Sequence, residues 1–212
     1  MHFNCINYLN LIFVFILLLR IKLKGVYKTE DNATLTTAGE SEQNRLQALL
    51  AYKILDTPAE REFDDLAALA AYICDTPIAL ITLLTEDRQW FKARIGISAP
   101  ETPRCHSFCQ YAIEKADILE IPDALQDIRF FQNPFVLGEP NIRFYAGSPL
   151  VNADGYKLGT LCVIDKFPRE LSESQKMALG SLANQVVAHL ELRLKIRQLE
   201  AENSNLQAQV KN

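Results

Sequence analysis

Residues 78–84 read IALITLL, an unbroken apolar run that follows Thr76-Pro77. Its length and flanks are typical of a β-strand that is buried on both faces. A turn at 85–89 and the alternating stretch WFKARIG at 90–96 follow it, which predicts a second, paired strand. A strand that hides both faces needs covering structure on each side of its sheet. The chain is therefore expected to build a sheet inside a layered domain.

Helical patterns precede these strands. The segments 43–55 and 56–74 place leucine and other apolar residues at helical spacing. Asp56 or Thr57 is expected to cap the second of these helices, because both side chains can accept a hydrogen bond from a free backbone N–H. The segment 29–42 is polar and lacks an apolar period, so it is interpreted as a linker.

The second half of the chain contains a hairpin and a long helix. Asp154-Gly155 is a strong turn signal between the apolar stretches 142–151 and 157–165. Ser172 and Gln175 form a capping-box pattern ahead of a long apolar period. The segment 123–141 has helical fragments broken by proline and glycine, so it is expected to cross the sheet irregularly. The predicted fold class is an α+β sandwich.

Charge and cysteine usage argue against nucleic-acid binding and against a disulfide-bonded framework. The 212 residues carry a net charge of -4 without a Lys/Arg cluster, which gives no footprint for nucleic acid. The five cysteines are scattered and form no C-x-x-C pair, which favours reduced thiols over a disulfide framework. We expect the working domain to be cytoplasmic.

The N-terminal segment 1–25 is hydrophobic, with LIFVFILLL at 11–19 followed by basic residues. Two interpretations stay open. Residues 8–24 can serve as a membrane anchor of minimal length, with the domain on the cytoplasmic side. Alternatively, the biased composition indicates a misassigned start, with the true one near Val26 or Leu35. With either interpretation of 1–25, the predicted linker as a whole occupies 26–42.

The apolar period changes near the C-terminus. From 192 to 212 the spacing alternates between four and three, which is a heptad seam formed by Leu192, Ile196, Leu199, Asn203, Leu206 and Val210. β-Branched residues at a, leucine at d and a single asparagine at a favour a parallel two-stranded coiled coil. A lone surface helix is the competing interpretation. Since the sequence stops at Asn212, we expect a fragment of a split or truncated protein, or a chain that pairs with another coiled-coil protein.

Four blocks in order carry a family resemblance: ILDTPAEREFDDLAALAA, ETPR…SFCQYAI, EIPDALQDIRFFQNPFV and IRFYAGSPLVNADGYKLGTLCVIDKFPREL. They resemble the GAF domain, in the subgroup at the front of bacterial sensor histidine kinases and diguanylate cyclases. The resemblance implies a domain at 43–191 with an antiparallel sheet of five or six strands. It places the N- and C-terminal helices on one face and a ligand pocket, covered by the crossing segment, on the other.

The same resemblance implies a regulatory sensor that binds a small ligand and dimerises through its terminal helices. Its expected partners are that ligand, a second copy, and a histidine kinase or diguanylate cyclase output. The Asn-Lys…Phe…Asp-Glu signature of cyclic-nucleotide-binding members does not occur between 45 and 195. The ligand is therefore unidentified.

Cys105, His106 and Cys109 lie within one turn of chain. The simplest interpretation makes Cys109 a packed thiol that borders the pocket. Zinc would need a fourth ligand, for which only Cys162 is available, so no metal site is expected. Three further possibilities stay open: an enzyme of thiol chemistry that resembles free methionine sulfoxide reductase, a bilin attached to Cys105, and haem bound through His106.

The remaining candidates are polar or aromatic residues expected to face a ligand in an apolar pocket. The ligand-binding set comprises Phe108, Cys109, Asp123, Asp127, Arg129, Phe130, Asn133, Tyr145, Thr160 and Cys162. Arg129, together with Arg143, Asp165 and Arg169, can instead form structural ion pairs and loop clamps. No catalytic constellation is evident, so an enzyme is not expected.

Overall fold

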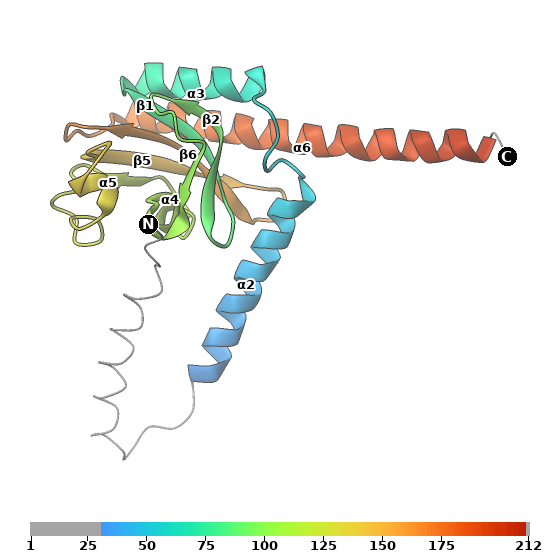
Figure 1. The fold of residues 1–212 in the computed structure, drawn as a ribbon, viewed down its shortest axis with the longest axis horizontal. Coiled ribbons are helices and arrows are strands. Elements are labelled where there is room, and N and C mark those ends of the chain that lie inside the picture. The colour runs from blue at the N-terminus through green and yellow to red at the C-terminus, as the bar shows by residue number, and fades with distance from the viewer. Residues whose placement is uncertain (1–30, 211–212) are drawn as a thin grey trace, which may run out of the picture. The chain divides into compact units, whose positions relative to one another are not determined.

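The computed structural model describes residues 31–210 and contains a six-stranded antiparallel sheet. Its strands are β1 (Ile78–Leu84), β2 (Arg88–Ile95), β3 (Glu101–Pro103), β4 (Leu119–Ile121), β5 (Phe144–Val151) and β6 (Lys157–Asp165). They lie in the order β3-β2-β1-β6-β5-β4 (Figure 1). The α+β fold class with a six-stranded sheet is confirmed. β3 was not predicted, because its Glu-Thr-Pro sequence has no strand pattern.

The helices divide between the two faces of the sheet. They are α2 (Asp31–Ala51), α3 (Arg61–Cys74), the short 3-10 turn η1 (Arg104–His106), α4 (Cys109–Ala112), α5 (Pro134–Leu137) and α6 (Glu173–Val210). α3 and α6 lie side by side on one face, and α4 and α5 lie on the other (Figure 1). This arrangement agrees with the predicted placement of the flanking helices.

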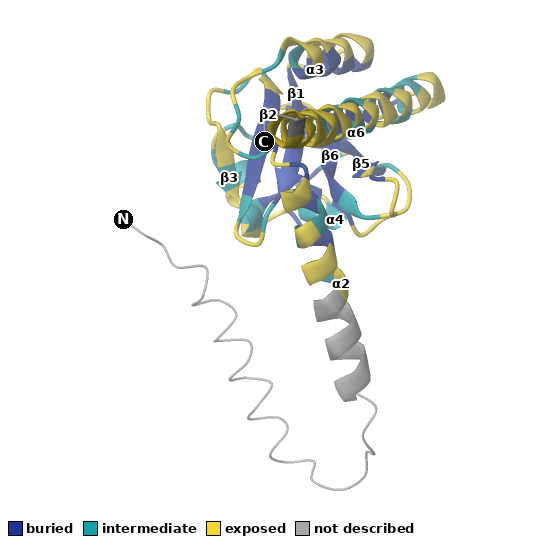
Figure 2. Cartoon of the chain, turned by 90° about the vertical axis from the view of Figure 1, so that its right-hand side faces the viewer, coloured by how far each residue is buried: buried dark blue, intermediate teal, exposed yellow. Residues whose placement is uncertain are grey.

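β1 is buried along its whole length, as the apolar run predicted. Ala79, Ile81 and Leu83 pack with α3 and α6 in one apolar cluster, while Ile78 and Leu80 belong to a second cluster on the opposite face. The central strands are therefore coloured as buried in Figure 2. The second cluster, on the face away from α3 and α6, positions the site described below.

One of the two predicted helix caps is present. Ser172 N donates to Gln175 Oε1 at 2.9 Å and Gln175 N donates to Ser172 Oγ at 3.3 Å, which confirms the capping box before α6. The cap predicted at Asp56 or Thr57 is wrong, because α3 begins only at Arg61. Thr57 instead donates to Ile54 O, and Asp56 pairs with Arg88.

The predicted N-terminal segments are described only in part. The hydrophobic segment 1–25, with the suggested anchor at 8–24, lies outside the described residues. Residues 31–42, within the predicted linker 26–42, form the first part of α2. A polar stretch can be helical without an apolar stripe. The linker interpretation relied on the absence of such a stripe. Within residues 31–210, no helix combines the length and apolar character needed to span a membrane.

Candidate functional site

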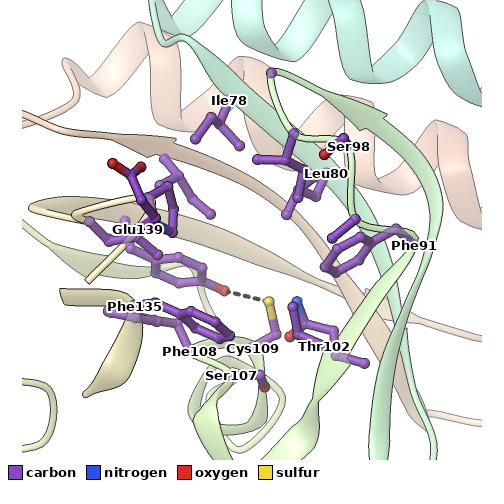
Figure 3. A pocket seen from close by; sticks show the side chains of 18 of the residues that line it. Ile78, Leu80, Phe91, Ser98, Thr102, Ser107, Phe108, Cys109, Phe135 and Glu139 are labelled. Carbon is purple, nitrogen blue, oxygen red and sulfur yellow. Dashed lines mark hydrogen bonds between the residues drawn. The ribbon is translucent and has the colours of Figure 1, made fainter. Parts of the chain in front are cut away.

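A cavity of about 380 Å³ lies between the second apolar cluster of the sheet and the segments that cover it (Figure 3). Its walls are mostly apolar and include Ile78, Leu80, Phe91, Phe108 and Phe135. β1 and β2 supply the first three of these residues, and the segments that contain α4 and α5 supply the others. A small concave site with apolar walls and a few polar groups is the usual form of a small-molecule site.

Four polar or thiol side chains meet at one end of this cavity. Cys109, the first residue of α4, accepts a hydrogen bond from Tyr145 Oη at 3.3 Å, drawn as a dashed line in Figure 3. Thr160 Oγ1 donates to the same sulfur at 3.1 Å, and Cys162 Sγ lies 3.8 Å away. Gly147 leaves room for the tyrosine, since a Cβ there would lie 2.1 Å from Tyr145 Oη.

These contacts separate the acidities of the two thiols. Burial alone raises the pKa of Cys109, but hydrogen bonds from Cys162, Thr160 and Tyr145 outweigh it and lower that pKa from 9.0 to about 7. Burial raises the pKa of Cys162 well above its ordinary value, and its hydrogen bond to Cys109 raises it further. Cys109 is therefore the thiol of this pair that ionises first.

Removing the tyrosine hydroxyl should make Cys109 less acidic. In a Tyr145→Phe variant the Cys109 thiolate loses one hydrogen-bond donor, so the pKa of Cys109 rises. Its alkylation at pH 7 should slow by about three- to tenfold, which corresponds to the free energy of one hydrogen bond. The rate of iodoacetamide labelling of the Cys109 peptide, followed by mass spectrometry across pH, measures the shift. Tyr111→Phe is the control, and an unchanged pH midpoint in Tyr145→Phe would contradict the assignment.

Gln89 contributes a polar group that the sequence pattern did not predict. It lies in β2, lines the cavity and is 5% exposed. Its Oε1 has no hydrogen-bond partner among the described residues. A buried acceptor without a partner costs free energy, which a ligand with a suitably placed donor would recover. The residue was assigned to a turn, although its position two before Phe91 places both on one face of a strand.

The aromatic and thiol candidates of the predicted set gather at the cavity. Phe108, Cys109 and Tyr145 line it. Phe130 is buried and stacks on Phe108, with ring centroids 4.1 Å apart, so it supports the wall from behind. Thr160 and Cys162 are fully buried and reach the cavity through their contacts with Cys109.

The structure does not bring the four polar candidates of the crossing segment into the cavity. Asp127 binds Arg129 at 2.5 Å, and this hydrogen bond lowers the pKa of its carboxyl group. Asp123 accepts from Leu125 N, and Asn133 caps α5 while it donates to His106 O. Local partners that lie mostly two residues away satisfy these side chains, which is the usual behaviour of Asp and Asn in turns.

The remaining basic candidates act as structural clamps. Arg143 donates to Val136 O at 2.8 Å and so holds the end of α5. Arg169 binds Asp165 at 2.8 Å and also donates to Cys74 O. These arginines tie loops to the sheet and to α3.

Cys105 and His106 lie in η1 and do not line the cavity. Cys105 is exposed, and the His106 ring packs edge-on against Phe135. Within residues 31–210, no group of three or more His, Cys, Asp or Glu side chains is arranged to hold a metal ion. Instead, Glu139 and Lys166, both exposed and 3.7 Å apart, give the cavity lining a charged pair that the sequence pattern also did not predict.

The predicted heptad seam lies on the distal part of α6 and is exposed. Leu192, Ile196, Leu199 and Leu206 are 57, 47, 51 and 61% exposed, and Val210 is the last residue of the helix. Asn203 lies between them and is exposed as well. This stripe lies C-terminal to Leu190, where α6 still packs in the core.

The sheet, with α3 and α6 on one face and the cavity on the other, is the arrangement that the four sequence blocks predicted. The model of the family "GAF domain" matches residues 58–190. The chain belongs to the GAF domain family, as the four sequence blocks suggested.

A curated relative aligns with most of the chain. It is 45% identical over 152 residues to "Cyclic di-GMP phosphodiesterase PA2567" of Pseudomonas aeruginosa, an alignment that covers 71% of this chain and 26% of that protein. The chain thus spans about a quarter of that relative's length.

Solved structures show the same fold at low identity. The GAF domain of an Acinetobacter phosphoenolpyruvate-protein phosphotransferase matches with a TM-score of 0.53 and 18% identity, over 76% of this chain and 95% of that chain. A free methionine-R-sulfoxide reductase of Neisseria meningitidis in complex with its substrate gives 0.53 and 16%, over 81% and 97%. At these identities the likeness concerns the fold alone.

Proposed function

We propose that this domain is a sensor that binds a small ligand in the cavity and relays its state through α6 to an output domain or partner. The observation that carries the proposal is Gln89, whose buried Oε1 lines the cavity without a hydrogen-bond partner in the described chain. Such a group is costly in a merely structural core and useful in a ligand site.

The lining limits the chemistry of the ligand. A cavity of about 380 Å³ with apolar walls suits a compact, largely apolar molecule. The ligand should carry an N–H or O–H group for Gln89, and Glu139 and Lys166 can bind a polar end. Cys105 lies outside the lining, which favours a ligand held without a covalent bond over a bilin attached to that cysteine.

An ion pair between a buried lysine and a partly exposed glutamate offers a route from the cavity to α6. Lys92 follows the lining residue Phe91 in β2, and its fully buried ammonium group binds Glu60 at 2.6 Å. Glu60 also binds Arg193 of α6, directly beside the start of the exposed seam at Leu192. A shift of β2 on ligand binding would therefore change the position of Arg193. We propose that this chain of contacts carries the signal.

The exposed seam and the relative suggest the partners. A second copy that pairs in parallel along the seam would bury its leucines, and a parallel pair of helices can pass a small movement onward. The chain resembles a cyclic di-GMP phosphodiesterase. We therefore propose an output in cyclic di-GMP signalling in preference to a histidine kinase output.

A Gln89→Leu variant tests the ligand site. Protein purified from its own host should carry a reproducible adduct in native mass spectrometry that is lost on denaturation, and the variant should retain about tenfold less of it. The ligand-free variant should also be more stable, by about 1 kcal/mol, because the unpartnered acceptor is gone. Exposed Gln126 gives the control Gln126→Leu. Wild-type protein without an adduct would contradict ligand sensing and favour a pure dimerisation module.

We also propose that the domain is not an enzyme. The one observation in favour of an enzyme of thiol chemistry is the contact between Cys109 and Cys162. Turnover of free methionine sulfoxide that is lost in Cys109→Ser but kept in Cys105→Ser would overturn this proposal. A sensor should show no turnover in any of these proteins.

A further inference from the structure

The two buried thiols beside the cavity form a pair that ligand sensing does not require. Cys109 belongs to α4 and Cys162 to β6, and the two sulfurs lie 3.8 Å apart although 53 positions separate the residues. A disulfide has an S–S length of about 2.0 Å, so the sulfurs need to approach by roughly 1.8 Å. Since α4 has only four residues, this adjustment involves a single short turn of helix.

The surroundings give the two thiols different roles. Cys109 lines the cavity, so a small molecule that enters can reach its sulfur, whereas Cys162 is fully buried behind it and is absent from the lining. Tyr145 and Thr160 both donate to Cys109 Sγ and so stabilise its thiolate. A thiolate in the wall of a cavity, with a second thiol beside it, is the arrangement of a peroxide-reactive cysteine and its resolving partner.

We propose that Cys109 and Cys162 form a reversible disulfide when a small hydroperoxide enters the cavity, so that the domain also responds to oxidation. The Cys109 thiolate attacks one peroxide oxygen, the O–O bond breaks, and the other oxygen leaves as hydroxide or alkoxide and takes a proton. The sulfur of Cys162 then attacks the sulfenic acid, and water leaves with the thiol proton. In total, two thiols and one peroxide give one disulfide, one water, and a second water or an alcohol.

This disulfide would change the site itself. The bond draws Cys109 Sγ toward Cys162 in β6, and a disulfide sulfur accepts the hydrogen bond from Tyr145 Oη, now 3.3 Å long, less strongly than a thiolate does. The tyrosine hydroxyl and the cavity end that it forms must then reorganise. Disulfide formation does not depend on the identity of the small ligand, because the hydroperoxide alone supplies the oxidising power.

Hydrogen peroxide on the full chain in a Cys105→Ser background tests the pair, since the exposed thiol of Cys105 is then absent. We expect a loss of two hydrogens, a cross-linked peptide joining Cys109 to Cys162, and recovery with dithiothreitol. In the added Cys162→Ser variant, Cys109 should remain as a sulfenic acid that dimedone traps. Cys74→Ala is the control and should still form the bond.

Two results would overturn the inference. One is a peroxide-treated chain in which Cys109 and Cys162 stay reduced, and the other is direct oxidation of Cys109 to sulfinic acid without a disulfide. Because both are read from the folded Cys105→Ser protein, they stand even if a Cys162 variant is unstable. Retained ligand binding after either result would leave the sensor proposal intact.

Discussion

We expect a Gly159→Ala variant to lose about 4 kcal/mol or more of folding free energy, a large share of the 5–15 kcal/mol typical of a domain. A Cβ at this position in β6 would lie 1.8 Å from Thr82 O and 2.7 Å from Thr82 C in β1. Both atoms belong to the backbone of a central strand, so no side chain can move aside. The two central strands would have to separate where they pair.

Urea unfolding followed by circular dichroism measures this loss. Gly180→Ala is the matched control, because a Cβ at Gly180 in α6 meets nothing within 4 Å. Alanine in a helix is better than glycine by about 0.5–1 kcal/mol, so this variant should be slightly more stable than the wild type. A Gly159→Ala protein with the wild-type midpoint would show that β1 and β6 can separate at low cost.

Strong local sequence patterns were enough to predict the central strand and the start of the long C-terminal helix. The run at 78–84 is β1, and the box formed by Ser172 and Gln175 precedes α6, because each depends on residues close in sequence. β3 was missed because Glu101–Pro103 becomes a strand only by pairing with β2. Its three residues carry no signal without that partner.

The positions of the candidate residues were predicted correctly where apolar character decides burial. Phe108 and Tyr145 line the cavity as expected, since aromatic residues near a pocket have little reason to face water. Asp123 and Asp127 were misplaced because short polar side chains find nearby backbone or side-chain partners, which composition does not reveal. Gln89 was missed because residues 85–89 were assigned to a turn, whereas β2 begins at Arg88 and places Gln89 in the cavity wall.

We expect a Leu199→Glu variant to weaken a homodimer by at least about 100-fold. Leu199 is 51% exposed in α6, and the residues three before and seven after it, Ile196 and Leu206, are exposed too. Burying a leucine contributes about 1.5–3 kcal/mol, and a symmetric pair loses two, which together amount to roughly 3 kcal/mol or more. Each 1.4 kcal/mol is a factor of ten in affinity. Two glutamates facing each other at d would add repulsion.

Sedimentation equilibrium over a range of protein concentrations measures the dimer. Gln198→Glu is the matched control: it adds the same charge at a c position of the same turn, outside the seam, and should leave the dimer unchanged. The isolated domain should fold normally in both variants, because the core contacts of α6 end near Leu190 and Leu194. A monomeric wild type would contradict the coiled coil, whereas equal weakening in both variants would indicate a charge effect without a seam. Only selective loss in Leu199→Glu supports a parallel pair that can carry the signal from Arg193.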